Sequence, residues 1–188
     1  MSLTNLLVPT YTSMLNALAG WLDKAQQHLA DADPQALLAA RLAPDMFPLA
    51  TQVWFTCRQA QEATYRLTGS AFPQSINDLL TQGLNAQTTP GSFADVRNAV
   101  ADTLALLASL APDALDMDPD APLEHELPNG MIFDFTAGQY ARDWALPQFY
   151  FHLMAAYAIL RSQNVPLGKI DYIPHLLPCL RQQPDPAG

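Results

Sequence analysis

Long stretches in which apolar residues recur at alternating steps of three and four constrain the fold more than any other feature of this sequence. Such stripes start at Leu7, Met46 and Phe93, and a fourth stretch, residues 137–163, is apolar almost all round. Each stripe is typical of one buried face of an α-helix. The first helix is expected to end within residues 31–34, ahead of a proline. Four long helices predict an all-α domain, and a four-helix bundle is the simplest arrangement that buries every stripe.

Capping residues predict where these helices begin and end. Asp45 is the expected N-cap of the second helix, and Gly69 is the expected left-handed residue at its end. Ser92 precedes the third helix, and its spacing from Asp95 resembles a capping box. Between the second and third helices, a short connecting helix is predicted over residues 75–84.

An acidic connection separates the third and fourth predicted helices. Residues 113–126 contain six acidic side chains and no Lys or Arg, which is typical of a solvated loop. A turn signal at 128–130 then lies between the apolar runs 123–127 and 131–135, so a small β-hairpin is predicted before the fourth helix. An isolated hairpin is only marginally stable, and we therefore expect it to pack across one end of the bundle.

The fourth predicted helix combines a wide apolar surface with an internal proline. A helix that is apolar on most sides lies at the centre of its bundle or is shared with a partner subunit. Pro147 cannot donate to the carbonyl of Asp143, so a kink is expected there. A single domain is predicted over residues 1–172, followed by an irregular, proline-rich tail over residues 173–188 that wraps the surface.

Charge and cysteine usage narrow the classes of function. Nine basic against eighteen acidic side chains give a formal charge of −9, which argues against binding to nucleic acid or to anionic membranes. No apolar stretch reaches the roughly 18 residues of a membrane span. Cys57 and Cys179 form neither a disulfide framework nor a metal-ligand spacing. The first residues lack the pattern of a secretory signal, and a cytoplasmic location is expected.

His152 is the histidine that most suggests function, because it lies midway along the most apolar helix. A polar ring in such a place needs a hydrogen-bond partner or a ligand. Gln148 is one turn earlier on the same face. Asp143 and Trp144 are further candidates for the mouth of a pocket, although a surface and packing pair explains them as well. Structural or surface roles are expected for the other histidines, which are His28, His125 and His175.

Several segments resemble one bacterial family. They read RLAPDMFPL at 41–49, ALPQFYFH at 145–152, AYAILR at 156–161 and VPLGKIDY at 165–172. They are similar to the domain-of-unknown-function family nineteen-ninety-three, within the DinB/YfiT-like superfamily. The likeness extends over about residues 6–172. It implies an up-down-down-up four-helix bundle and a homodimer.

The same resemblance implies a divalent-metal site, often nickel or zinc, made by one histidine of the second helix and two of the fourth. His152 falls at the second histidine of the fourth helix, Gln148 at the first, and Gln52 near the histidine of the second helix. Because an amide oxygen is a weak ligand for these metals, one good ligand of three is left. No cofactor is expected, with weak or altered nickel or zinc binding as the alternative.

Three functions follow as hypotheses. In the first, a bundle with a lost metal centre binds a small molecule, with His152 as polar anchor and Gln52 and Gln148 orienting the ligand. Any catalysis would use His152 as a general base near neutral pH, with its protonation set by burial and by the glutamine contacts. In the second, the chain is a metal-dependent transferase acting on thiols or other small molecules. In the third, it is a non-enzymatic homodimer whose fourth helix is mostly interface. The choice between an enzyme and a binding module stays open.

Overall fold

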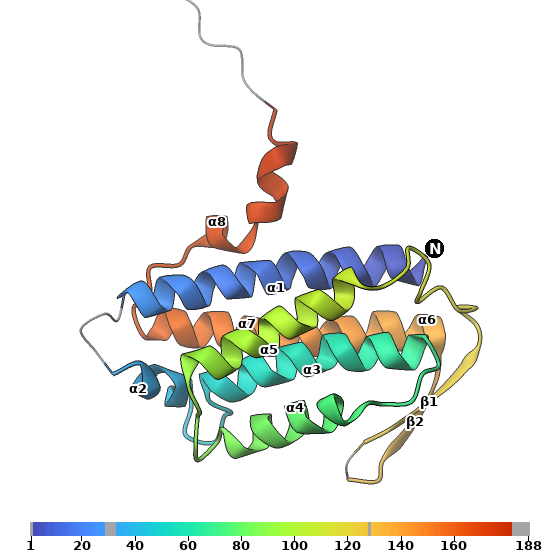
Figure 1. The fold of residues 1–188 in the computed structure, drawn as a ribbon, viewed down its shortest axis with the longest axis horizontal. Helices are drawn as coiled ribbons and strands as arrows, with labels where there is room; N and C mark the ends of the chain where they lie inside the picture. Colours follow the sequence, from blue (N-terminus) through green and yellow to red (C-terminus); the bar gives the residue numbers. More distant parts are fainter. Residues whose placement is uncertain (1, 29–32, 128, 182–188) are drawn as a thin grey trace, which may run out of the picture.

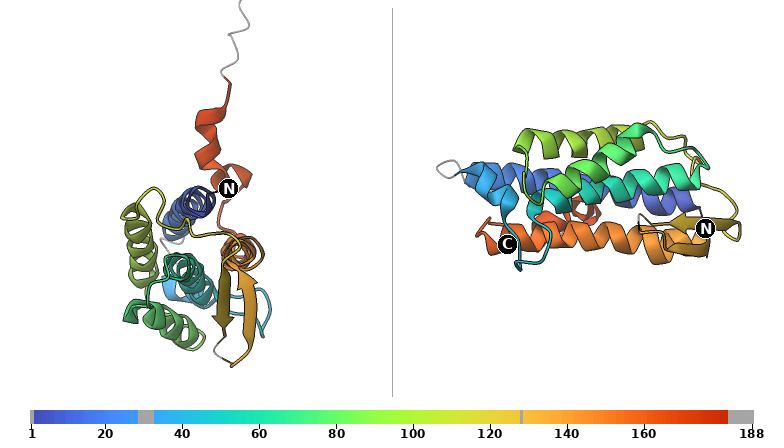
Figure 2. Two further views of the ribbon diagram at one scale, coloured as in Figure 1. Left: turned by 90° about the vertical axis from the view of Figure 1, so that its right-hand side faces the viewer. Right: turned by 90° about the horizontal axis from the view of Figure 1, so that it is seen from below.

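Four long helices form the body of the protein in the computed structural model, which describes residues 2–28, 33–127 and 129–181. These helices are α1 (Leu3–His28), α3 (Leu49–Leu67), α5 (Phe93–Ala108) and α7 (Leu146–Ser162). Helix α3 packs against both α5 and α7, and α1 closes the other side against the same two helices (Figures 1 and 2). The chain runs in one direction along α1 and α7 and in the opposite direction along α3 and α5 (Figure 1).

Shorter elements decorate this body. They are α2 (Pro34–Ala39), α4 (Gln74–Asn85), β1 (Pro122–Glu126), β2 (Ile132–Thr136), α6 (Ala137–Gln139), η1 (Tyr140–Ala145), α8 (Lys169–Tyr172) and η2 (Pro174–Cys179). Helix α4 packs on the outer side of α3 (Figure 2), and the prediction of a short connecting helix is confirmed. Within the described part of the chain, no helix has both the length and the hydropathy needed to cross a membrane.

The core fills the space between the long helices. Its largest fully buried side chains include Tyr11 and Trp21 of α1, Tyr140 of η1 and Phe149 of α7. Trp21 also donates its indole N–H to the carbonyl of Asp171 at 2.8 Å. This bond ties the segment after α7 back onto α1, which is the kind of polar partner that a buried indole requires.

The helix ends agree with the capping predictions except at the start of α3. Ser92 accepts from the Asp95 N–H at 3.2 Å and donates its own N–H to the Asp95 carboxylate at 2.8 Å, which completes the capping box. Gly69 has φ +67° just past α3, as predicted. The N-cap of α3 is Pro48, however, and the prediction of Asp45 is wrong. A residue that precedes proline avoids the helical region, so the helix cannot begin before Pro48.

The proline of the fourth helix is accommodated by a change of helix type. The chain forms α6, then the π-helical stretch η1, and α7 begins one residue before Pro147. The N–H of Leu146 donates to the carbonyl of Ala141, five residues earlier. This wider turn is how the helix adjusts to a residue that lacks an N–H and crowds the preceding turn.

The predicted β-hairpin is present, whereas the predicted irregular tail that wraps the surface is not found over residues 174–179. Strands β1 and β2 are antiparallel, with Leu123 opposite Phe135 and His125 opposite Phe133. The segment 174–179, predicted to be irregular, forms a 3₁₀-helix that projects away from the bundle instead of wrapping it (Figure 1). Residues 182–188 of the predicted tail and residues 31–32 at the predicted end of the first helix lie outside the described residues.

The close approach of α4 to α3 requires a glycine. A Cβ atom on Gly83 would lie 2.3 Å from Cε1 of Phe55, a contact that only movement of the ring or helix can relieve. We expect Gly83→Ala to lower the free energy of unfolding by about 1–3 kcal/mol through overpacking, measured by urea denaturation. Gly20→Ala is the matched control, because nothing lies within 4 Å of the added Cβ of this exposed residue in α1. It should stabilise the protein by roughly 0.5–1 kcal/mol, and equal losses in both variants would contradict the packing argument.

Candidate functional site

His152 of α7 and Gln52 of α3 meet in the interior between the two helices. The His152 Nδ1 lies 2.9 Å from the Gln52 Oε1, and the two residues are 7% and 2% exposed. Gln52 also donates from Nε2 to the carbonyl of Phe47 at 3.3 Å. That second bond fixes the orientation of the amide, so its oxygen faces the imidazole and accepts from Nδ1–H. The resulting tautomer leaves the lone pair of Nε2 free to accept a hydrogen bond or to ligate a metal.

The environment of His152 keeps its imidazole neutral. Burial, and to a smaller extent the positive charge of Arg58, lower the pKa of His152 to about 4. The ring also packs edge-on against Phe55, with centroids 5.3 Å apart. The role of general base stays a prediction, and the lowered pKa would make His152 a weak one near neutral pH. At pH 7 the side chain is a weakly basic hydrogen-bond acceptor.

The other predicted pocket residues divide into two groups. Gln148 is half-buried and lies one turn before His152. Asp143 is exposed and forms a two-point ion pair with Arg142, at 2.8 and 2.7 Å, which holds the pKa of this carboxyl below its usual range. Asp143 lies nine residues before His152, or roughly 13 Å along the helix axis. It is therefore not part of the His152 site.

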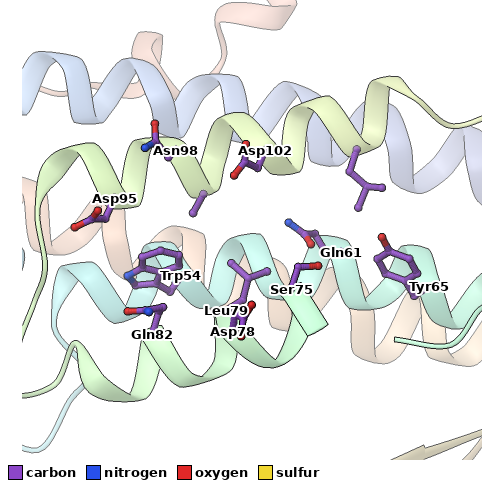
Figure 3. A pocket seen from close by; sticks show the side chains of 12 residues that line it. Trp54, Gln61, Tyr65, Ser75, Asp78, Leu79, Gln82, Asp95, Asn98 and Asp102 are labelled. Atoms are coloured by element: carbon purple, nitrogen blue, oxygen red, sulfur yellow. The ribbon is translucent and has the colours of Figure 1, made fainter. Parts of the chain in front are cut away.

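Trp144 belongs to an aromatic cluster at the hairpin. Its ring centroid lies 4.6 Å from that of His125 and 5.2 Å from that of Phe133. The structure thus places Trp144 against β1 and β2 and away from His152 and Gln52. A cavity of about 590 Å³ opens elsewhere, between α3, α4 and α5, and none of the five predicted pocket residues lines it (Figure 3).

His125 occupies a buried position that the sequence did not predict. It is 2% exposed, and neither ring nitrogen has a hydrogen-bond partner among the described residues. Its Nδ1 lies 3.7 Å from Oε1 of Glu62. Burial lowers the pKa of His125 to about 4; the charge of Arg66 acts in the same direction and that of Glu62 opposes it. Strand alternation explains the burial, since His125 faces inward between the exposed side chains of Glu124 and Glu126.

Glu62 is a buried carboxylate held by two arginines of its own helix. It is 2% exposed, and its two oxygens lie 2.9 Å from Arg58 Nη1 and 3.0 Å from Arg66 Nη2. Arg66 also donates to the carbonyl of Glu124 at 3.4 Å, which links α3 to the hairpin. The i, i+4, i+8 spacing of Arg58, Glu62 and Arg66 is the sequence signal that could have revealed this cluster.

The donor set around His152 decides what the site can hold. Residues 2–28, 33–127 and 129–181 contain no group of three or more His, Cys, Asp or Glu side chains arranged to share a metal ion. Around His152 the other two candidate positions carry amides, and the oxygen of Gln52 is already engaged with Nδ1–H. These residues do not fit a centre of three imidazoles, whereas they fit a ligand that donates a hydrogen bond to Nε2.

Comparisons with known proteins show which solved structures this fold is similar to. No curated protein matches the chain. A crystal structure of a DinB family member from Shewanella denitrificans matches with a TM-score of 0.72 and 30% sequence identity, over 91% of each chain. The chain is thus similar to a DinB family protein over nearly its whole length.

One family model also matches nearly the whole chain. The model of a domain of unknown function, DUF1993, matches residues 3–173, which include all four long helices and the hairpin. The family resemblance of the sequence motifs is thereby confirmed. The chain belongs to the DUF1993 family and is a DinB-like protein of mostly helical structure.

Proposed function

We propose that this protein is an up-down-down-up DinB-like bundle with a degenerate metal site, and that it binds a small molecule at His152 in place of the metal. The observation that carries the proposal is the buried hydrogen bond between His152 Nδ1 and Gln52 Oε1, at 2.9 Å. In this bond Gln52 stands where the family pattern would place the histidine of the second helix, and its amide oxygen is already engaged. The neutral imidazole of His152 keeps its Nε2 as a hydrogen-bond acceptor for a ligand.

The chemistry of the site favours a ligand with one hydrogen-bond donor and an apolar body. A neutral imidazole accepts from an O–H or N–H group, and Gln148 supplies a second polar group one turn away. The edge-on contact of Phe55 with the imidazole makes the surroundings apolar. Sites of this composition, with few polar groups among aromatic side chains, are typical of small-ligand binding.

Metal content tests the degenerate site. Untagged protein incubated with nickel or zinc and then desalted should hold much less than one metal per chain by elemental mass spectrometry, because a lone imidazole with two amides is a poor ligand set. The double variant Gln52→His, Gln148→His should bind about one zinc per chain, because it supplies the two missing imidazoles. One metal per chain in the natural protein, lost in His152→Ala, would overturn the proposal and favour the metal-dependent transferase. Thermal shift against a metabolite panel, again with His152→Ala as the control, then tests ligand binding.

A specific observation favours homodimer formation as a second candidate property. On the outer side of α7, Phe151 is 64% exposed and Met154 is 39% exposed, three residues apart on one face. Adjacent exposed apolar side chains are typical of interaction surfaces. Light scattering should give the mass of a dimer for the natural protein and that of a monomer for Phe151→Glu. Equal masses for the two proteins would contradict a dimer through this face.

A further inference from the structure

The β-hairpin is held to the bundle through few buried side chains. It lies outside the four long helices, at one end of the bundle (Figures 1 and 2). Of the residues of β1 and β2, all of which the structure describes, only Leu123 and His125 are buried. The hydrogen bond from Arg66 to the carbonyl of Glu124 is long, at 3.4 Å. His125 is therefore one of the two side chains that chiefly hold the hairpin closed.

The imidazole of His125 is enclosed but makes no hydrogen bond. It is 2% exposed, and neither ring nitrogen has a partner among the described residues. The Glu62 Oε1 that faces it lies 3.7 Å from Nδ1, beyond hydrogen-bond distance. That oxygen already accepts from Nε and Nη2 of Arg66, at 3.0 Å each. With the hairpin closed, an imidazolium would therefore have two N–H donors and no acceptor for either.

The charges around His125 also oppose a second ring proton. The charged and titratable groups that face the ring, or lie beside it in the hairpin, are Arg58, Glu62 and Arg66 of α3, Tyr140 of η1, Glu124 and Glu126 of β1, and Asp134 of β2. The three hairpin carboxylates are exposed on the opposite face of the sheet, where water screens them. On the buried face, a proton on His125 would add a third positive charge beside a single carboxylate.

Backbone hydrogen bonds fix the base of the hairpin. The N–H of Ala137 donates to the carbonyl of Ala121 at 2.9 Å, and the N–H of Gly138 donates to the carbonyl of Pro119 at 2.8 Å. Among the described residues, no backbone–backbone hydrogen bond joins either strand to α3 or η1. The strands can therefore pivot about residues 119–121 and 137–138 when the side-chain contacts of His125 and Leu123 are released.

We propose that the hairpin is a pH-sensitive latch: when the His125 imidazole takes up a proton from solvent, β1 and β2 pivot away from α3 and η1. Opening gives both ring N–H groups access to water, which the closed arrangement denies them. It also uncovers the ring of Trp144, whose centroid lies 4.6 Å from that of His125 in the closed state. The latch is independent of the proposed ligand site, because His152 and Gln52 do not take part in it.

Hydrogen exchange of the full chain, followed by mass spectrometry of peptides that cover residues 118–136, tests the proposal. A detached hairpin is only marginally stable, so the amides of β1 and β2 exchange when it opens. The pKa of His125 is about 4 in the closed state and near 6.5 when solvated, so opening should increase by about twentyfold between pH 7 and pH 5. After correction for the intrinsic pH dependence of exchange, the protection of these amides should decrease by the same factor.

Two variants assign the effect to one imidazole. His125→Phe keeps an aromatic ring against Trp144 without a titrating group, and its hairpin protection should change less than about twofold between pH 7 and pH 5. His152→Asn should keep the full decrease, which separates this test from that of the proposed function. An equal decrease in His125→Phe, no decrease in the natural protein, or hairpin amides as strongly protected as those of α5 at both pH values would each overturn the proposal. Circular dichroism of every variant confirms that the fold is intact.

Discussion

Glu62→Gln is expected to lower the free energy of unfolding by about 3–5 kcal/mol, the usual cost of removing one partner from a buried ion pair. The carboxylate is 2% exposed, and the arginines on either side of it are 16% and 18% exposed. An amide of the same shape cannot compensate two guanidinium groups, so Arg58 and Arg66 would be left charged in a poorly solvated place. Urea denaturation at pH 7, followed by circular dichroism, measures the loss.

A matched variant isolates the burial of the charge. Glu124→Gln makes the same chemical change on the exposed side of β1, next to the same two arginines. Its free energy of unfolding should stay within about 0.5 kcal/mol of that of the natural protein. Similar losses for the two variants would show that net charge matters and that the buried triad does not. A negligible loss for Glu62→Gln would show that water reaches the arginines freely.

The long helices could be predicted from the sequence because their signal is local. In α5 the apolar steps and the Ser92–Asp95 capping box specify both the buried face and the start of the helix. The start of α3 was predicted incorrectly, since a plausible capping residue at Asp45 competed with the backbone restriction before Pro48. The short helix α2 was not predicted, because six residues, Pro34–Ala39, are too few to show a period.

The residues of the candidate site were predicted only where the family motifs indicated which residues, distant in sequence, lie close together in the fold. Gln52 and His152 are 100 residues apart and still form a hydrogen bond, a pairing that periodicity alone does not indicate. His125 and Glu62 lie in segments with no shared pattern, and their contact depends on how the hairpin folds onto α3. From the sequence alone, a single charged residue on an amphipathic helix is predicted to be exposed. The burial of Glu62 could therefore be found only from the packed structure.

Stability is expected to fall by about 4 kcal/mol between pH 7 and pH 5, with about half from each of His125 and His152. Both pKa values are lowered to about 4 in the folded protein, mainly by burial. The unfolded chain, in which histidine titrates near 6.5, therefore binds more protons than the folded chain between pH 6.5 and 4. The contribution is fully present above pH 6.5 and is lost as the pH falls toward 4. Urea denaturation at half-unit steps of pH measures this slope.

Two substitutions can remove the titrating groups without removing their packing. His125→Phe keeps an aromatic ring in a place where neither imidazole nitrogen has a partner among the described residues. His152→Asn keeps an N–H donor for Gln52, the role that Nδ1 plays in the natural protein. Each should remove about half of the decrease between pH 7 and pH 5, and the double variant should be nearly flat. His28→Gln, an exposed position at the end of α1, should leave the slope unchanged. If the double variant retained the full slope, carboxylates would have to carry it, and the two imidazoles would have to be charged or solvated in the folded state.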